Sequence, residues 1–216
     1  MKRAACRVRR RYLAAVPPGL GAYSNSQGVE VVRQEVAAFI ERRDGYPSDA
    51  GNIFLTNGAS EGVRMLMQTL IRGGAQRDGM LIPIPQYPLY SALTTLFDGE
   101  LVGYYMDEDL QQGWTMDGTE LQRAYDEAAA RGVSTRGLVV INPGNPASGN
   151  LSVAKMRTLV RFCLRNGLLL MADEVYQENL YGELAAGGGF VSFKARAEVE
   201  NASHAEQLCS TRSSKS

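Results

Sequence analysis

Histidine and cysteine are scarce in this sequence of 216 residues. His204 is the single histidine and lies in a polar stretch, which excludes histidine-based catalytic triads and metal sites with several histidine ligands. Cys6, Cys163 and Cys209 are odd in number and widely spaced, with no C-x-x-C pair. This pattern indicates reduced thiols and argues against a disulfide framework or a zinc site, so we expect no metal.

An excess of charge and a long apolar run are also missing. Lys and Arg total 23 and Asp and Glu total 23, so we expect no nucleic-acid partner. No run approaches the ~18 apolar residues of a membrane helix, and the first residues lack the apolar core of a secretory signal. We therefore expect a soluble, cytoplasmic chain without a membrane partner. The arginine-rich start, which has no acidic residue before Glu30, makes a mitochondrial location the alternative.

Residues 137–181 form the stretch around which the chain is organised. Two short apolar runs, at residues 138–141 and 168–172, flank a segment of helical period, which predicts a β-α-β unit. Asn142 follows the first predicted strand, and Asp173 follows the second. Open α/β sheets bind ligands at the carboxyl ends of their strands. We therefore expect both side chains to converge on one ligand.

The polar residues at these strand ends suit a ligand with a basic ring nitrogen and an ionised oxygen. Pyridoxal phosphate is such a ligand. Asp173 would keep the pyridine nitrogen protonated, which makes the ring an electron sink. Asn142 and Tyr176 would hydrogen-bond the ring oxygen. An Asn-Pro-Gly turn alone is more often only a turn, so the prediction depends on the two segments together.

Two further segments have the features expected of phosphate and ring contacts. Residues 52–57 are read as a strand, followed by Gly58, Ala59, Ser60 and a helix. A helix that opens with small residues presents N–H groups and a positive dipole end to phosphate, although an ordinary helix start is the alternative. Tyr87 lies between two prolines after a predicted strand at residues 80–84, where its ring could lie flat on a pyridine or be only a buried loop tyrosine.

The motifs NPGNP at residues 142–146 and ADEVYQENLY at residues 172–181 resemble the fold-type I pyridoxal-phosphate aminotransferases, within them the alanine aminotransferase branch. The resemblance implies a three-layer α/β/α large domain with a mainly parallel sheet, at residues 29–216. It implies transamination between alanine and 2-oxoglutarate by a homodimer that takes amino acid and 2-oxo acid substrates. A glutamate:glyoxylate aminotransferase is the alternative. The family usually continues with Thr-Gly, where this chain has Ala147 and Ser148.

The resemblance implies roles for residues near both ends of the chain. Residues 1–28 would form an arm with a short helix and a loop, GAYSNSQG, whose Tyr23 reaches the cofactor phosphate of the other subunit. Lys215, in a degraded serine-rich segment, would form the Schiff base, since its separation from Asp173 is close to that in the family; Lys194, read as a loop residue, is the alternative. The family's glycine- and arginine-containing segment and small domain, which supplies a substrate arginine, do not follow. We expect truncation to impair activity, and an inactive fragment that associates with full-length subunits is the alternative from another class.

The remaining segments are expected to be scaffold. We predict helices around residues 31–40, 121–129 and from Ser152 to a stop at Gly167, a strand at residues 101–106 and a solvated acidic turn at residues 107–109. Cys163 falls on the apolar face of the helix after Ser152. It is therefore expected in the core and not as a nucleophile.

Overall fold

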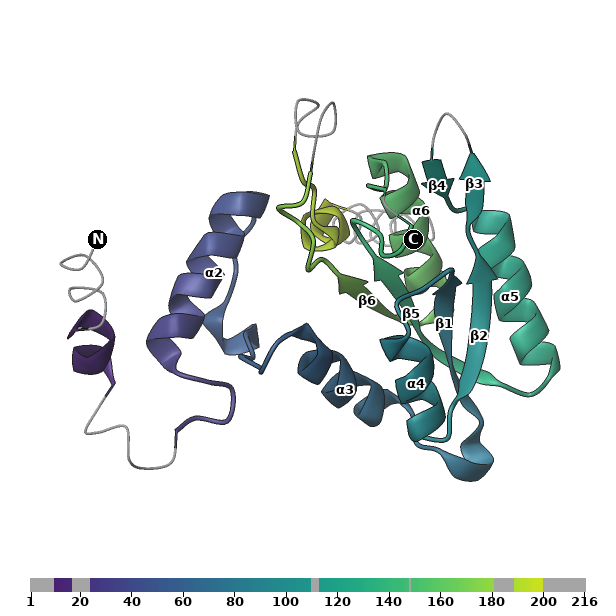
Figure 1. The fold of residues 1–216 in the computed structure, drawn as a ribbon, viewed down its shortest axis with the longest axis horizontal. Helices are drawn as coiled ribbons and strands as arrows, with labels where there is room; N and C mark the ends of the chain where they lie inside the picture. The colour runs from purple at the N-terminus through teal and green to yellow at the C-terminus, as the bar shows by residue number, and fades with distance from the viewer. Residues whose placement is uncertain (1–9, 17–23, 110–112, 148, 181–188, 200–216) are drawn as a thin grey trace, which may run out of the picture. The chain divides into compact units, whose positions relative to one another are not determined.

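The computed structural model describes residues 10–16, 24–109, 113–147, 149–180 and 189–199. It divides into two compact units, Met1–Asn57 and Gly58–Ser216. Figure 1 draws both, and each is described by itself. No helix in these ranges is long and apolar enough to cross a membrane.

The first unit is built on helix α2 (Glu30–Asp44), whose C-cap is Gly45 with a φ of 76°. Residues 10–15 are also helical, and the Arg11 guanidinium and the Tyr12 hydroxyl both bind the carboxylate of Glu35. The side chain of Arg33 is buried and donates to the carbonyl oxygens of Gly28 (3.1 Å) and Ala50 (2.7 Å). These contacts attach the short helix and the loops of this unit to α2.

The strand predicted at residues 52–57 does not form. A short 3-10 helix, η1 (Ala50–Asn52), begins the segment, and the rest is irregular. The N–H of Leu55 donates to the carbonyl oxygen of Gln27, which is not in a strand, at 2.8 Å. Phe54 is 60% exposed. A strand needs a neighbouring strand for its N–H and C=O groups, and no described strand pairs with these residues.

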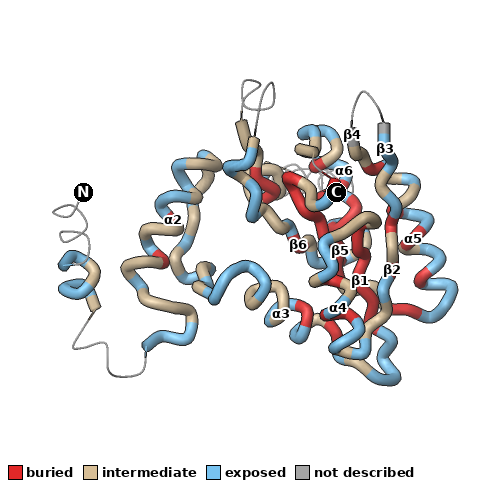
Figure 2. The backbone as a smooth tube through the Cα atoms, in the orientation of Figure 1, coloured by how far each residue is buried: buried red, intermediate tan, exposed pale blue. Residues whose placement is uncertain are grey.

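The second unit contains a parallel sheet of four strands in the order β2-β1-β5-β6. Its strands are β1 (Asp78–Ile84), β2 (Glu100–Tyr105), β5 (Ser134–Ile141) and β6 (Leu169–Asp173). Strands β1 and β5 are buried along nearly their whole apolar runs, as is typical of a sheet covered on both faces (Figure 2). The register pairs Ile141 with Asp173, so the chain leaves β5 and β6 at the same sheet edge.

Helices cover both faces of this sheet. Residues 81, 138 and 140 pack in one core cluster with α5 (Gly118–Ala130) and α6 (Val153–Asn166). Residues 80, 82 and 139 point to the other face and pack with α3 (Ala59–Leu70) and α4 (Leu89–Leu96). This alternation follows from the two-residue period of a strand. The predicted three-layer α/β/α fold with a mainly parallel sheet is confirmed.

The scaffold predictions are largely right, with two corrections. The acidic residues 107–109 are not a solvated turn but strand β3 (Asp107–Asp109), which pairs antiparallel with β4 (Gly113–Thr115). Lys194 does not lie in a loop, because residues 193–199 are helical. The hydroxyl of Ser192 accepts from the N–H of Ala195 (3.0 Å) at the start of this helix. Cys163 is buried in the core, as expected.

Candidate functional site

A pocket of about 250 Å³ lies at the carboxyl ends of the strands. The start of α3, the segment after β1, the turn after β5 and the end of β6 all contribute to it. Its lining residues come from the second unit alone: Ala59, Ser60, Val63, Tyr87, Leu89, Ile141, Asn145, Asp173, Val175 and Tyr176. Five of the residues predicted from the sequence are therefore brought together at one place.

Asp173 ends β6 with its carboxylate half-buried against this pocket. Oδ2 accepts a hydrogen bond from the Tyr90 hydroxyl at 2.6 Å, and Oδ1 accepts one from the N–H of Val175 at 3.2 Å. Tyr90 is buried, and burial together with the hydrogen bond to the carboxylate raises the pKa of its phenol. Tyr90 is a site residue that the sequence analysis did not identify.

The two asparagines of the NPGNP turn lie in different environments. Asn145 lines the pocket, and its Nδ2 lies 3.2 Å from the hydroxyl oxygen of Tyr176. Asn142 is fully buried, is not among the lining residues, and accepts the N–H of Leu151 on Oδ1 at 2.8 Å. Its Nδ2 is buried without a hydrogen-bond partner among the described residues. The second Asn-Pro of the motif was the signal in the sequence that could have pointed to Asn145.

The aromatic ring of Tyr87 borders the same pocket. Tyr87 is 44% exposed, unlike the buried Tyr90 in the same segment. Pro88 is the N-cap of α4 and directly follows Tyr87, so the ring is held close to a helix start. A large face that is partly exposed at a pocket rim is available for stacking on a planar ligand.

Helix α3 directs its N-terminus to the pocket. Gly58 is its N-cap, with a φ of 81° that side-chain-bearing residues rarely adopt, and it has no side chain to cap the helix. Ala59 and Ser60 follow and line the pocket. The first-turn N–H groups of a helix have no intrahelical acceptor and carry the positive end of its dipole. This arrangement can hold an anion such as phosphate.

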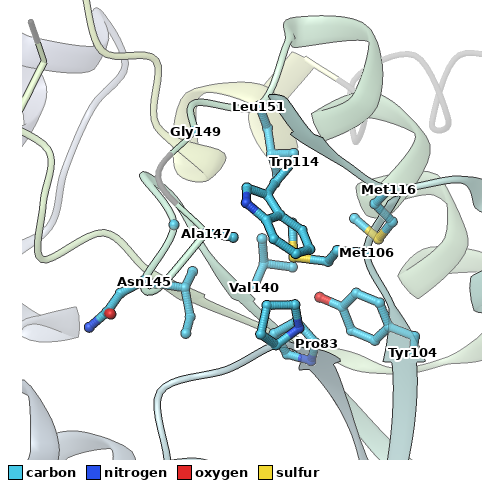
Figure 3. A pocket seen from close by; sticks show the side chains of 13 residues that line it. Pro83, Tyr104, Met106, Trp114, Met116, Val140, Asn145, Ala147, Gly149 and Leu151 are labelled. Atoms are coloured by element: carbon cyan, nitrogen blue, oxygen red, sulfur yellow. The ribbon is translucent and has the colours of Figure 1, made fainter. Parts of the chain in front are cut away.

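A second, much smaller cavity lies on the other side of the NPGNP turn. Its volume is about 20 Å³, and apolar side chains dominate its lining, among them Tyr104, Met106, Trp114 and Met116 (Figure 3). The Asn145 amide points away from these apolar side chains (Figure 3). A space of this size holds about one water molecule, so we assign it a packing role and not a ligand.

Three residues with predicted or alternative cofactor roles are not among the described residues that line the pocket. Tyr23 and Lys215 lie outside the described residues. Lys194 is on the helix of residues 193–199 and is not among the residues that line the pocket.

The sequence is similar to known proteins over most of its length. Residues 2–215 match the family described as aminotransferase class I and II. The chain is 51% identical over 172 residues to glutamate–glyoxylate aminotransferase 2 of Arabidopsis thaliana, covering 80% of this chain and 35% of that protein. It is 48% identical over 182 residues to a probable mitochondrial alanine aminotransferase of Dictyostelium discoideum, covering 84% of this chain and 33% of that protein. The chain thus spans about a third of the length of these relatives.

Solved structures share the fold. An aminotransferase from Escherichia coli superposes with a TM-score of 0.70 at 27% identity, covering 89% of this chain and 43% of that one. An alanine aminotransferase from Pyrococcus furiosus gives a TM-score of 0.69 at 21% identity, covering 87% of this chain and 44% of that one, a likeness that shows the fold alone. With the family match over nearly its whole length, the chain belongs to the class I and II aminotransferases.

Proposed function

We propose that this chain is the cofactor-binding part of an aminotransferase that exchanges amino groups between alanine and 2-oxoglutarate, giving pyruvate and glutamate. The class I and II aminotransferases depend on pyridoxal phosphate. The single observation that carries the proposal is the grouping of a carboxylate, a phenol, an amide, an exposed aromatic ring and a helix N-terminus around one pocket. The carboxylate matches the ring nitrogen of that cofactor, the phenol and the amide match its ring oxygen, the aromatic ring matches its face and the helix N-terminus matches its phosphate.

The residues around the pyridine ring fit the cofactor chemically. Asp173 offers a half-buried carboxylate to the ring N–H, which favours the protonated ring. Tyr176 and Asn145 are assigned to the ring oxygen. Because the Tyr176 oxygen accepts from the Asn145 amide, its own proton stays available for a ligand oxygen. Asn142 keeps its predicted role as a further donor, supported by its buried Nδ2 without a described partner.

The remaining contacts hold the ring face and the phosphate. Tyr87 stacks on the ring, and the α3 start at Gly58, Ala59 and Ser60 binds the phosphate. When bound, the cofactor supplies the electron sink that lets the amino-acid α-carbon lose its proton. Lys215 is the proposed covalent attachment point and proton carrier, and Tyr23 the proposed phosphate contact to a partner subunit in a homodimer.

A glutamate:glyoxylate aminotransferase is the second candidate. The 51% identity to a protein of that name favours it over other substrate pairs, while other relatives are named as alanine aminotransferases. An assay of a full-length relative that contains this sequence, with pyruvate and glyoxylate side by side, separates the two. If neither pyruvate nor glyoxylate accepts the amino group, both proposed activities are rejected. Because named relatives are mitochondrial, we keep a mitochondrial location as the alternative to a cytoplasmic one.

Reductive trapping tests the proposed attachment. The purified chain is incubated with pyridoxal phosphate, reduced with borohydride, digested and analysed by mass spectrometry. We expect the label on Lys215 and no alanine turnover by these 216 residues alone. Label on Lys194, or spread over many lysines, would reject the assignment. A Lys215→Arg variant is the matched control and should lose the specific label. Measurable alanine turnover by the chain alone would contradict the expected impairment, whereas an inactive fragment would show no specific label at all.

A further inference from the structure

Tyr90 connects the helix-covered core to the proposed cofactor pocket. It lies in the first turn of α4, and its hydroxyl reaches the Asp173 carboxylate on β6, 83 residues further along the chain, at 2.6 Å. Its ring is 1% exposed and packs in the core cluster formed by α3, α4 and one face of the sheet. The phenol is therefore fixed by packing before any ligand enters.

The direction of this hydrogen bond is fixed as well. Burial, followed by the hydrogen bond and the charge of Asp173, raises the pKa of Tyr90, so the phenol keeps its proton throughout the usual pH range. A protonated phenol beside a carboxylate must donate to it. This charge-assisted hydrogen bond holds the Asp173 carboxylate in one orientation.

The geometry of Asp173 leaves room for one more partner. Oδ2 is bonded to Tyr90 and Oδ1 to the Val175 N–H, so both oxygens are attached to fixed elements. Each carboxylate oxygen accepts up to two hydrogen bonds. The group therefore has unused acceptor capacity while it borders the pocket with Tyr87 and Tyr176.

We propose that Tyr90 is a positioning residue, which holds the Asp173 carboxylate in the orientation that receives the ring nitrogen of the cofactor. The inference rests on the proposed function and extends it to a residue that does not line the pocket. Without the hydroxyl, Oδ2 would face a buried apolar ring, and the carboxylate would lose the contact that sets its rotamer. The loss of binding affinity should therefore be confined to ligands that possess a ring nitrogen.

Tyr104 offers a matched control. It is also 1% exposed, and its hydroxyl donates to the carbonyl oxygen of Val139 at 2.8 Å, so Tyr104→Phe removes one buried hydrogen bond just as Tyr90→Phe does. Its acceptor belongs to the sheet backbone and not to the pocket. An effect that arises from general loosening of the core should appear in both variants.

The test uses pyridoxamine phosphate, which binds without a lysine bond, and its carbocyclic analogue, in which a ring CH replaces the pyridine nitrogen. Dissociation constants are measured by fluorescence titration for the unmodified chain, Tyr90→Phe and Tyr104→Phe. We expect Tyr90→Phe to weaken pyridoxamine phosphate binding about tenfold, the range of a hydrogen bond to a charged group, and to leave the analogue unchanged. Tyr104→Phe should leave the ratio of the two constants unchanged.

Equal weakening of both ligands by Tyr90→Phe, or no weakening, would overturn the inference, as would equal affinity of the unmodified chain for both ligands. Failure of the unmodified chain to bind either ligand would instead overturn the proposed function. A second measurement needs no variant. In the unmodified chain labelled at tyrosine, the Tyr90 hydroxyl proton resonance should move when pyridoxamine phosphate binds and stay in place with the analogue. The opposite pattern contradicts the inference even where Tyr90→Phe does not fold.

Discussion

Asp78 is the residue on which two arginines converge at the amino end of the sheet. It is fully buried, and its carboxylate accepts from Arg72 Nε at 2.8 Å and from Arg136 Nε at 2.6 Å. It also accepts the backbone N–H of Arg72 at 3.0 Å, just after α3 ends. This single side chain therefore connects the end of α3 to β1 and β5.

Asp78→Ala should destabilise the fold. The substitution leaves two guanidinium groups without their carboxylate, and because both arginines are partly exposed we expect a loss of about 2 kcal/mol in the free energy of unfolding. Urea unfolding followed by circular dichroism measures it. Glu61→Ala removes an exposed pair with Arg64 and should produce no measurable change. Similar losses in the two variants would contradict this account of Asp78.

Cys163 should be an unreactive thiol. Burial raises its pKa to about 12 from the ordinary value of 9.0, so the folded protein holds it protonated at pH 9. The contribution of this thiol to the free energy of unfolding is fully present below pH 9.0. It is lost as the pH rises from 9.0 toward about 12, because the thiol of the unfolded chain ionises first. In a variant with Cys6→Ser and Cys209→Ser, we expect slow labelling by iodoacetamide at pH 9 and fast labelling in urea. Fast labelling without urea would contradict the assigned burial.

At the scale of elements, the end of α6 depends on one backbone conformation. Gly167 adopts a φ of 63°, its N–H bonds the carbonyl oxygen of Cys163, and an added Cβ would meet nothing within 4 Å. The cost of a side chain there is therefore conformational and not steric crowding.

Gly167→Ala should lower the free energy of unfolding by about 1 kcal/mol. Gly167→Asn should cost less, because asparagine tolerates the left-handed region better than alanine. Thermal or urea unfolding of both variants checks the order. If both variants lower the free energy of unfolding equally, the backbone angle φ at residue 167 does not control the effect.

The sequence predicts those elements whose pattern is local. Helix α6 begins after Ser152 and ends at Gly167, as its cap and stop residues indicate, and the apolar runs of β5 and β6 form neighbouring parallel strands. The prediction at residues 52–57 fails because strand formation depends on a partner, which no local pattern reveals. The acidic run at residues 107–109 forms a strand because β4 pairs with it, although aspartate is a poor strand former.

At the scale of the whole chain, the sequence predicts which residues line the pocket, but it does not predict how these residues contact one another. The motifs brought Asp173, Tyr176, Tyr87, Ala59 and Ser60 to one pocket. They did not separate Asn142 from Asn145, because turn geometry decides which amide faces the cleft. They did not reveal Tyr90 either, since a buried tyrosine on a helix looks like core until its hydroxyl partner is known.

The central claim is that this pocket binds pyridoxal phosphate through Asp173, and equilibrium titration of the purified chain tests it most directly. Isothermal titration is carried out with the unmodified chain, Asp173→Asn and the distant control Thr158→Ala, whose hydroxyl bonds only the Ala154 carbonyl in the described contacts. We expect saturable binding at one site, weakened at least about tenfold by Asp173→Asn, which removes the negative charge opposite the ring nitrogen and keeps the shape. Thr158→Ala should bind as the unmodified chain does. Absence of saturable binding, or equal affinity of Asp173→Asn and the unmodified chain, would contradict the account.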